Sequence, residues 1–328
     1  MGITPKGGPA DCRSAAGACS RDPAGRSGKD GDTLRMNRIA GIILVVASAA
    51  GFGTLALFGR YAYADGMDAL TILCLRFGLA AIPALALLAV RRERLPRGSV
   101  LVRLIGMGVL GYVGAAFAYL AALKYASAGL VALLLYLYPI FVALFAILLF
   151  HEPLTGAKGL ALGLALTGTA LAVGPLRGQA PGILLAIGSA LLYAIYIIVG
   201  TGVMRRVSPV QSSTVIFATA GVCNGVLMML TGPHLPATAR GWAAIIAMVV
   251  ITTLLPVVAF LSGLKRIGPT NAAMLSTLEP VVTVLLAGWW LNEKLTLVSL
   301  LGGGLILTAV LLLTHVELSR SSPSVAGD

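Results

Sequence analysis

The sequence has few charged residues, and this scarcity excludes most classes of soluble protein. Asp, Glu, Lys and Arg together make up 11% of the 328 residues, whereas about 25% is typical of soluble domains. Hydrophobic residues make up 58%, and the mean hydropathy is +0.94. A chain this apolar cannot cover a globular surface with polar side chains, so a lipid environment is predicted.

The chain also lacks the residue groupings that enzymes and ATP-driven pumps use. It has three histidines, each in a loop or at the end of an apolar run, and no glycine-rich phosphate-binding loop with its lysine. Cys74 and Cys223 lie within apolar runs, while Cys12 and Cys19 lie near the N-terminus, so we predict neither a disulfide framework nor a metal site. We therefore expect no enzyme activity, no cofactor and no metal.

Ten apolar runs, each close to the length that crosses a bilayer, follow one another along the chain. A hydrocarbon core about 30 Å thick needs roughly 20 helical residues at 1.5 Å each. The runs lie at 39–58, 69–90, 104–123, 130–150, 159–173, 182–200, 212–230, 242–261, 271–291 and 297–313. They predict an all-α integral membrane protein with ten transmembrane helices.

The distribution of basic residues predicts the orientation of these helices. With a cytoplasmic N-terminus, eighteen of the 24 Lys and Arg fall on the cytoplasmic side and five on the outer side, and Arg76 lies within a span. This is the positive-inside pattern, so we expect a multi-pass protein of the cell inner membrane with both termini in the cytoplasm. Because the basic residues flank the spans, the net charge of +12 does not indicate a nucleic-acid partner.

The two ends of the chain differ in composition from the rest. Residues 1–35 are rich in Gly, Ala, Ser, Asp and Arg without an apolar period, which predicts a disordered cytoplasmic tail, and Met36 is an alternative natural start. A second cytoplasmic tail is predicted at 315–328. The remaining residues are predicted to form two units, at 36–174 and 179–314.

These two units are repeats of one another. Residues 119–155 align without a gap to residues 260–296, at an offset of 141. The identities include polar and proline positions that chance apolar similarity would not match: Lys124 with Lys265, Pro139 with Pro280, Glu152 with Glu293, and Thr155 with Thr296. Each half then holds five spans, and because five is odd, the second half enters the membrane from the opposite side. Many secondary transporters are built from such inverted repeats.

The motifs of the two halves resemble those of a known family. Each half closes its fourth span with the pattern P-x12-E-x-L-T, in PIFVALFAILLFHEPLT and PVVTVLLAGWWLNEKLT, and LRFGLAA follows the first outer loop. In these motifs the chain resembles the EamA-type members of the drug/metabolite transporter superfamily, from residue 36 to about residue 315. The resemblance implies a ten-helix inner-membrane carrier, often an exporter of amino acids or related metabolites.

Glu279 is the acidic residue that the pattern places well inside a span. An ionisable group facing lipid costs about 2.5–3.5 kcal/mol on insertion scales, so its presence indicates a functional site. Helical spacing puts Ser276 and Thr283 on the same face, and Pro280 cannot donate to the Ser276 carbonyl, which predicts a kink that lines a cavity. The sequence leaves three roles open for Glu279: a substrate amine site, a proton site, or a permanently paired carboxyl.

Arg76 is the basic counterpart of this acid. Its predicted depth differs from that of Glu279 by only about 6 Å. It either pairs with Glu279, holds a substrate carboxylate through two parallel hydrogen bonds, or bonds to a neighbouring helix or the interface. The repeat offset gives Phe217 as its second-half counterpart, so any role of Arg76 is asymmetric between the halves.

The first-half counterparts of Glu279 and Pro280 are Tyr138 and Pro139, which are predicted to line the same central cavity with a hydroxyl and a kink. The Tyr138 hydroxyl either bonds the substrate or Glu279, or is satisfied within the helix packing. Further candidates at lower rank are Tyr193, Tyr196, Thr252 and Thr253.

Two other features are interpreted as structural. Thr155 and Thr296, the threonines of the two E-x-L-T motifs, are predicted to cap the helices that follow them. Gly159 and Gly163, at G-x-x-x-G spacing, and Gly302, Gly303 and Gly304 predict close approaches of the fifth and tenth helices to their neighbours.

Together these patterns predict a secondary transporter that moves a small amino-acid-like or amphipathic metabolite across the inner membrane by alternating access, in the direction of export. Its partners would be the lipid bilayer, the substrate and, if transport is coupled, protons, with the chain acting as a monomer or homodimer. The alternative is a membrane scaffold, or a subunit of an intramembrane enzyme complex, that transports nothing.

Overall fold

The computed structural model describes residues 24–126, 128–172, 178–290 and 296–319, and over these residues the chain is helical. The first half contains α1 (Ala24–Gly53), α2 (Leu55–Ala64), α3 (Ala69–Val90), α4 (Ser99–Gly106), the π-helix η1 (Met107–Gly114), α5 (Ala115–Ala122), α6 (Ala128–Leu135), α7 (Tyr138–Phe150) and α8 (Gly156–Ala172). The second half contains α9 (Ala180–Val203), α10 (Pro209–Thr231), α11 (Ala239–Val249), the π-helix η2 (Val250–Leu254), α12 (Leu255–Ile267), α13 (Pro269–Ser276), α14 (Glu279–Trp290) and α15 (Leu297–Ser319).

These helices make ten apolar crossings. In the part of the chain that the structure describes, nine helical stretches are long and apolar enough to span a bilayer, and α8 is a shorter apolar helix. Each coincides with one of the ten predicted runs, so the all-α, ten-helix prediction is confirmed. The outward side chains are apolar too, as Leu184, Met229 and Leu230 illustrate, because a lipid-facing surface needs no polar residues.

The first and last helices reach past the predicted repeat units. Helix α1 begins at Ala24, whereas the apolar span that it enters runs from Arg35 to Ala64. Residues 24–35 contain no proline, which would interrupt a helix. At the other end α15 continues to Ser319, past the expected end of the second repeat. Residues 1–23 and 320–328 of the two predicted tails lie outside the described residues.

The inverted repeat extends to irregularities of the backbone. The fourth span of the first half is broken between α6 and α7, and shifting both helices by 141 residues reproduces the bounds of α13 and the first residue of α14. The third span of each half contains a π-helix, and the same shift brings η1 onto η2. Each half therefore has a broken fourth span and a widened third span at matching positions.

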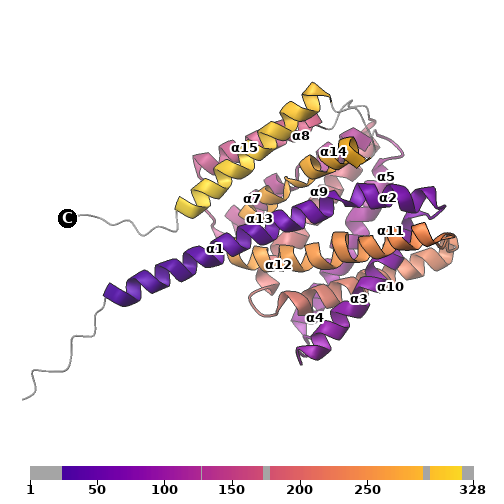
Figure 1. Cartoon of the computed structure of the whole chain (residues 1–328), viewed down its shortest axis with the longest axis horizontal. Helices are drawn as coiled ribbons and strands as arrows, with labels where there is room; N and C mark the ends of the chain where they lie inside the picture. The colour runs from indigo at the N-terminus through magenta and orange to yellow at the C-terminus, as the bar shows by residue number, and fades with distance from the viewer. Residues whose placement is uncertain (1–23, 127, 173–177, 291–295, 320–328) are drawn as a thin grey trace, which may run out of the picture.

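Helix pairs from the two halves hold the bundle together. Figure 1 shows α15 lying along α8 at one edge, with α3 and α10 at the opposite edge. Between these edges α1 of the first half packs on α12 of the second half. The contact related to it by the repeat is that of α9 in the second half with α5 in the first. The broken and widened spans each contribute residues to the protein interior, where loosened backbone can be satisfied by protein or can line a cavity.

The contact between α8 and α15 yields a stability prediction. A Cβ at Gly168 would lie 2.5 Å from the carbonyl oxygen of Gly302, whereas a Cβ at Gly159 or Gly163 would meet nothing within 4 Å. The close approach therefore lies beyond the predicted glycine pair. We expect Gly168→Ala to lower the thermal unfolding midpoint in detergent. Gly163→Ala should leave it unchanged or raise it, because alanine is about 0.5–1 kcal/mol more favourable than glycine in a helix. Equal midpoints for the two variants would contradict this account.

Candidate central cavity

A cavity of about 800 Å³ lies in the middle of the bundle. We call the membrane face where α1 enters and α15 leaves the terminal side, and the opposite face the far side. The lining of the cavity comes from the far-side half of the spans and includes Arg60 near the end of α2, Ala69 at the start of α3 and Leu123 just after α5. The cavity therefore extends from mid-bundle to the far-side ends of the helices.

Glu279 is on the wall of this cavity because its helix is broken. Helix α13 ends at Ser276, α14 begins at Glu279, and Pro280 follows at its second position, where the missing N–H is not needed. The Glu279 side chain is half-buried, and Pro280 and Thr283 line the cavity beside it. The first residue of a helix also lies at the positive end of the helix dipole, which favours a negative charge.

The break also separates residues that helical spacing would group together. Thr283 lies on the cavity wall and donates from its hydroxyl to the Gly53 carbonyl oxygen at 3.0 Å. Ser276 instead ends α13, is buried, and donates to the Ala272 carbonyl oxygen at 2.9 Å without lining the cavity. The predicted three-residue stripe is therefore divided, because α13 and α14 are not one continuous helix.

The first-half counterparts are joined to the second half. Tyr138 lines the cavity, and its hydroxyl donates to the carbonyl oxygen of Ala273 in α13 at 3.2 Å. Pro139 is buried in α7 and is not among the lining residues. The Tyr138 hydroxyl thus links the start of α7 to helix α13 of the second half.

Arg76 lines the cavity from α3, and its guanidinium bonds to the widened eighth span. Nε donates to Thr253 Oγ1 at 2.6 Å, and one terminal nitrogen donates to the Thr252 carbonyl oxygen at 2.9 Å. That carbonyl would accept from the residue four positions later in an α-helix, but this residue is Pro256, which has no N–H. Arg76 therefore supplies the hydrogen bond that Pro256 cannot. Among the alternatives from the sequence, bonding to a neighbouring helix matches these contacts.

Aromatic rings make up much of the remaining wall, and most of them were not among the candidates from the sequence. The rings that line the cavity are Phe52, Tyr63, Phe77, Tyr112, Tyr119, Tyr136, Tyr138 and Tyr193. Some of them contact one another, with centroids 4.8 Å apart for Tyr138 and Tyr193 and 5.0 Å apart for Phe77 and Tyr112. The repeat offset pairs Tyr112 with Thr253, so the internal repeat was the signal that could have identified Tyr112.

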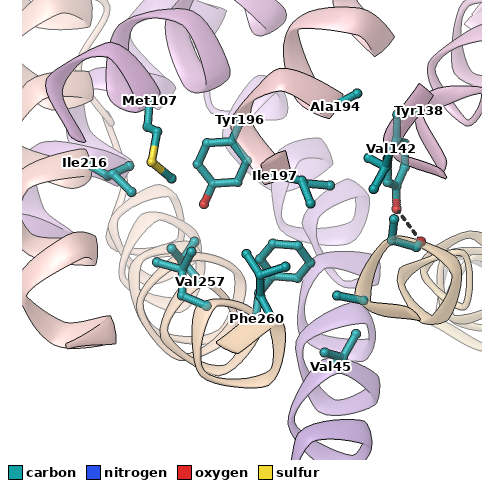
Figure 2. Close-up of a cluster of buried hydrophobic side chains, with 14 of the residues drawn as sticks. Val45, Met107, Tyr138, Val142, Ala194, Tyr196, Ile197, Ile216, Val257 and Phe260 are labelled. Atoms are coloured by element: carbon teal, nitrogen blue, oxygen red, sulfur yellow. Dashed lines mark hydrogen bonds between the residues drawn. The ribbon is translucent and has the colours of Figure 1, made fainter. Parts of the chain in front are cut away.

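A layer of buried side chains closes the cavity toward the terminal side. We call it the closing layer and define it as Val142, Tyr196, Ile197, Val257 and Phe260, all of which belong to one apolar cluster. Figure 2 shows these side chains gathered between the helices, with the Tyr138 hydroxyl bonded nearby.

Beyond the closing layer lies a second pocket of about 350 Å³, which we call the terminal pocket. Along α9, Tyr193 lines the central cavity, Ile197 belongs to the closing layer, and Thr201 lines the terminal pocket. Along α12, Phe260 belongs to the closing layer and Leu264 lines the terminal pocket. Cavity, layer and pocket therefore follow one another across the membrane.

At the far side, the loops of the two halves are tied by Asp65. Its carboxylate accepts hydrogen bonds from the Thr238 hydroxyl at 2.6 Å and from the backbone N–H groups of Ala237 and Thr238. The hydrogen bond from the Thr238 hydroxyl is the main reason that the pKa of Asp65 lies below its ordinary value. Across the described residues, no three His, Cys, Asp or Glu side chains cluster as metal ligands would.

Comparison with known proteins settles the family. The sequence profile of the EamA-like transporter family matches residues 39–174 and again residues 180–315. The chain belongs to the EamA-like transporter family. The two matches are related by the same offset of 141 as the internal repeat. EamA proteins form part of the drug/metabolite transporter superfamily, so the resemblance drawn from the motifs is confirmed.

The EamA relatives cover most of the chain. An uncharacterized transporter of Archaeoglobus fulgidus is 30% identical over 270 residues, which are 82% of this chain and 94% of the relative. The uncharacterized transporter YcbK of Bacillus subtilis is 25% identical over 285 residues, 81% of this chain and 89% of the relative. A solved crystal structure with 22% identity superposes with a TM-score of 0.73 over 89% of this chain and 99% of that one, a likeness of fold alone.

Proposed function

We propose that this EamA-family protein is a secondary transporter that carries a small amino-acid-like or amphipathic metabolite through the central cavity by alternating access. The observation that carries the proposal is the order of cavity, closing layer and terminal pocket across the membrane. A carrier in one of its two states has a substrate site that is reachable from one side and sealed from the other. Membership of a transporter family supports the same reading.

The lining of the cavity supports a substrate with an amine and an apolar body. Glu279 lines the cavity. The Thr283 hydroxyl donates to the backbone carbonyl oxygen of Glu279 and not to its carboxylate. An ammonium group would pair with this carboxylate, and the surrounding rings would cover an apolar or aromatic body. Arg76 uses two of its five N–H donors on the protein, which leaves donors for a substrate carboxylate.

Direction and coupling follow from the same residues. We take the terminal side as the cytoplasmic side of the inner membrane, because the basic residues of the chain gather there. In an export cycle, Glu279 would release a proton when the amine binds and take one up from the far side when the substrate leaves. One carboxyl group would then serve both substrate and proton, so that export is driven by proton entry.

A matched panel of compounds tests the proposal. Amines, amino acids and carboxylic acids that share one apolar body are compared by thermal shift on the purified protein and by uptake into proteoliposomes. We expect the amines and amino acids to raise the unfolding midpoint and to be transported, because binding to the folded state stabilises it. The carboxylic acids should do neither.

Thiol labelling separates the carrier from the scaffold alternative. In a protein whose cysteines are replaced by serine, Thr283→Cys should react with a charged thiol reagent from the far side and be protected by a transported amine. Thr231→Cys, at the exposed end of α10 and outside the cavity, is the control that should react without protection. A scaffold would give no flux with any compound and no protection at Thr283.

A further inference from the structure

Glu152 binds residues of both halves at the terminal side. This residue lies in the turn between α7 and α8 and lines the terminal pocket. Its Oε1 pairs with Lys158 Nζ of α8 at 2.9 Å, and its Oε2 accepts a hydrogen bond from Thr270 Oγ1 of α13 at 3.0 Å. Because α13 belongs to the second half, this carboxylate fastens the halves to each other beside the closing layer.

The cation of this cluster is deeply buried. The Lys158 side chain is 2% exposed and Glu152 is 21% exposed, while Thr270 is 2% exposed. A buried ammonium is strongly disfavoured without a partner, so the ion pair with Lys158 fixes the Glu152 carboxylate in this position. Separating the halves at this point would break the hydrogen bond from Thr270 to Glu152 and uncover the ion pair between Lys158 and Glu152.

The two partners of the Glu152 carboxylate are specific to the first half's turn. The repeat offset pairs Lys158 with Ser299 and Thr270 with Gly129, so neither residue type recurs at the matching position. Glu293, the counterpart of Glu152, lies outside the described residues.

The turn between α7 and α8, which carries the ion pair of Glu152 and Lys158, differs from its second-half counterpart before α15. In the second half the Ser299 backbone N–H donates to Thr296 Oγ1 at 3.1 Å, so the predicted cap at Thr296 is confirmed. In the first half Lys158 occupies the position of Ser299, and the Thr155 hydroxyl is buried without a hydrogen-bond partner, so the predicted cap at Thr155 is wrong. A cap to Ala substitution typically costs about 1 kcal/mol. The first half therefore forgoes one stabilising contact where it carries the ion pair.

We propose that Glu152, Lys158 and Thr270 form a one-sided gate latch that holds the carrier closed at the terminal side and thereby sets its resting state as open to the far side. The inference rests on the proposed function. In a carrier of two inverted halves, the two access states would be equal in free energy if the halves were identical, so a contact made by one gate alone shifts the balance. A latch on one gate stabilises only the state in which that gate is closed.

Two cysteine reporters in a protein without native cysteines measure the balance between the states. Thr283→Cys lies in the central cavity and reports access from the far side. Ala194→Cys is fully buried in the cluster around the closing layer and reports opening of the terminal side. In Lys158→Met we expect Ala194→Cys to react about tenfold faster from the terminal side and Thr283→Cys to react more slowly from the far side, as expected for a population shift.

Two further variants make the test specific. Thr270→Val removes only the hydrogen bond between the halves, keeps the shape of the side chain, and should shift both rates in the same directions. Lys265→Met is the matched control, because Lys265 lines the same terminal pocket. Among the residues that the structure describes, ion pairs join Lys158 to Glu152 and His234 to Asp68, and neither includes Lys265. It should leave both rates unchanged.

The labelling ratio distinguishes a latch from a purely structural contact. If the ratio of the two rates is the same in Lys158→Met, Thr270→Val and the parent, the latch is overturned, whatever happens to thermal stability. A structural role would lower the unfolding midpoint without moving the ratio. Failure of the proposed function would appear separately, as absence of flux and of substrate protection in the parent protein.

Discussion

Glu279→Gln is expected to lower substrate flux in proteoliposomes by about a hundredfold, since losing one partner of a desolvated charge pair costs roughly 2–5 kcal/mol. The amide keeps the size of the side chain but can neither pair with an ammonium nor exchange a proton. Flux is measured with a radiolabelled amine or amino acid from the panel, with and without an imposed pH gradient. The remaining flux should no longer respond to the gradient.

A second acid serves as the control for this variant. Glu93 lies in the loop after α3, where it accepts a hydrogen bond from the Ser208 hydroxyl, away from the central cavity. Glu93→Gln should keep both flux and its dependence on the gradient. Flux in Glu279→Gln at the parent rate and with the parent pH dependence would remove Glu279 from both the amine site and the coupling.

Arg76→Met is expected to destabilise the folded protein as well as weaken binding. It removes the hydrogen bonds that the guanidinium donates to the Thr252 carbonyl and the Thr253 hydroxyl, and Pro256 has no N–H to replace the first. A hydrogen bond from a charged group contributes about 1.5–3 kcal/mol. Arg76→Lys should be intermediate, because an ammonium is a compact charge that does not reproduce the planar fork of arginine. The measurement is the unfolding midpoint in detergent without substrate.

Binding by the same variants separates the two roles of the arginine. If Arg76 acts only on the eighth span, amines and amino acids lose affinity equally as the helix shifts. If it also holds a substrate carboxylate, amino acids lose more affinity than amines with the same apolar body. An unchanged midpoint in Arg76→Met would contradict the structural role that we derive from its hydrogen bonds.

Much of the fold could be predicted because hydropathy and the repeat report directly on membrane crossings. Each apolar run is long enough that its existence does not depend on its boundaries, and a proline marks each broken fourth span. The packing details could not be predicted in the same way. The interior of the bundle and the lipid are equally apolar, so periodicity does not reveal which face of a span is buried. For this reason the sequence pointed to the G-x-x-x-G pair of α8, whereas the structure shows that α8 approaches α15 at Gly168.

The residues of the candidate site also differ in whether the sequence alone could identify them. Glu279 and Arg76 could be selected from the sequence because a charge inside a span is rare. Tyr112 and Phe77 could not, because aromatic residues in apolar runs are common and only the fold brings these rings to one cavity. Helical spacing groups Ser276 with Thr283 because it assumes a continuous helix, whereas the break before Glu279 leaves Ser276 off the cavity wall.

The unequal halves have a consequence for how a substrate can lie in the cavity. The repeat pairs Arg76 with Phe217 and Glu279 with Tyr138, so at these two mid-bundle positions each half contributes one charge and lacks the other. Two copies of the first half would present two arginines at this depth, and two copies of the second would present two glutamates. The single chain has one of each there, which removes the twofold ambiguity of a symmetric cavity. A zwitterion that meets both charges would therefore be bound in one orientation only.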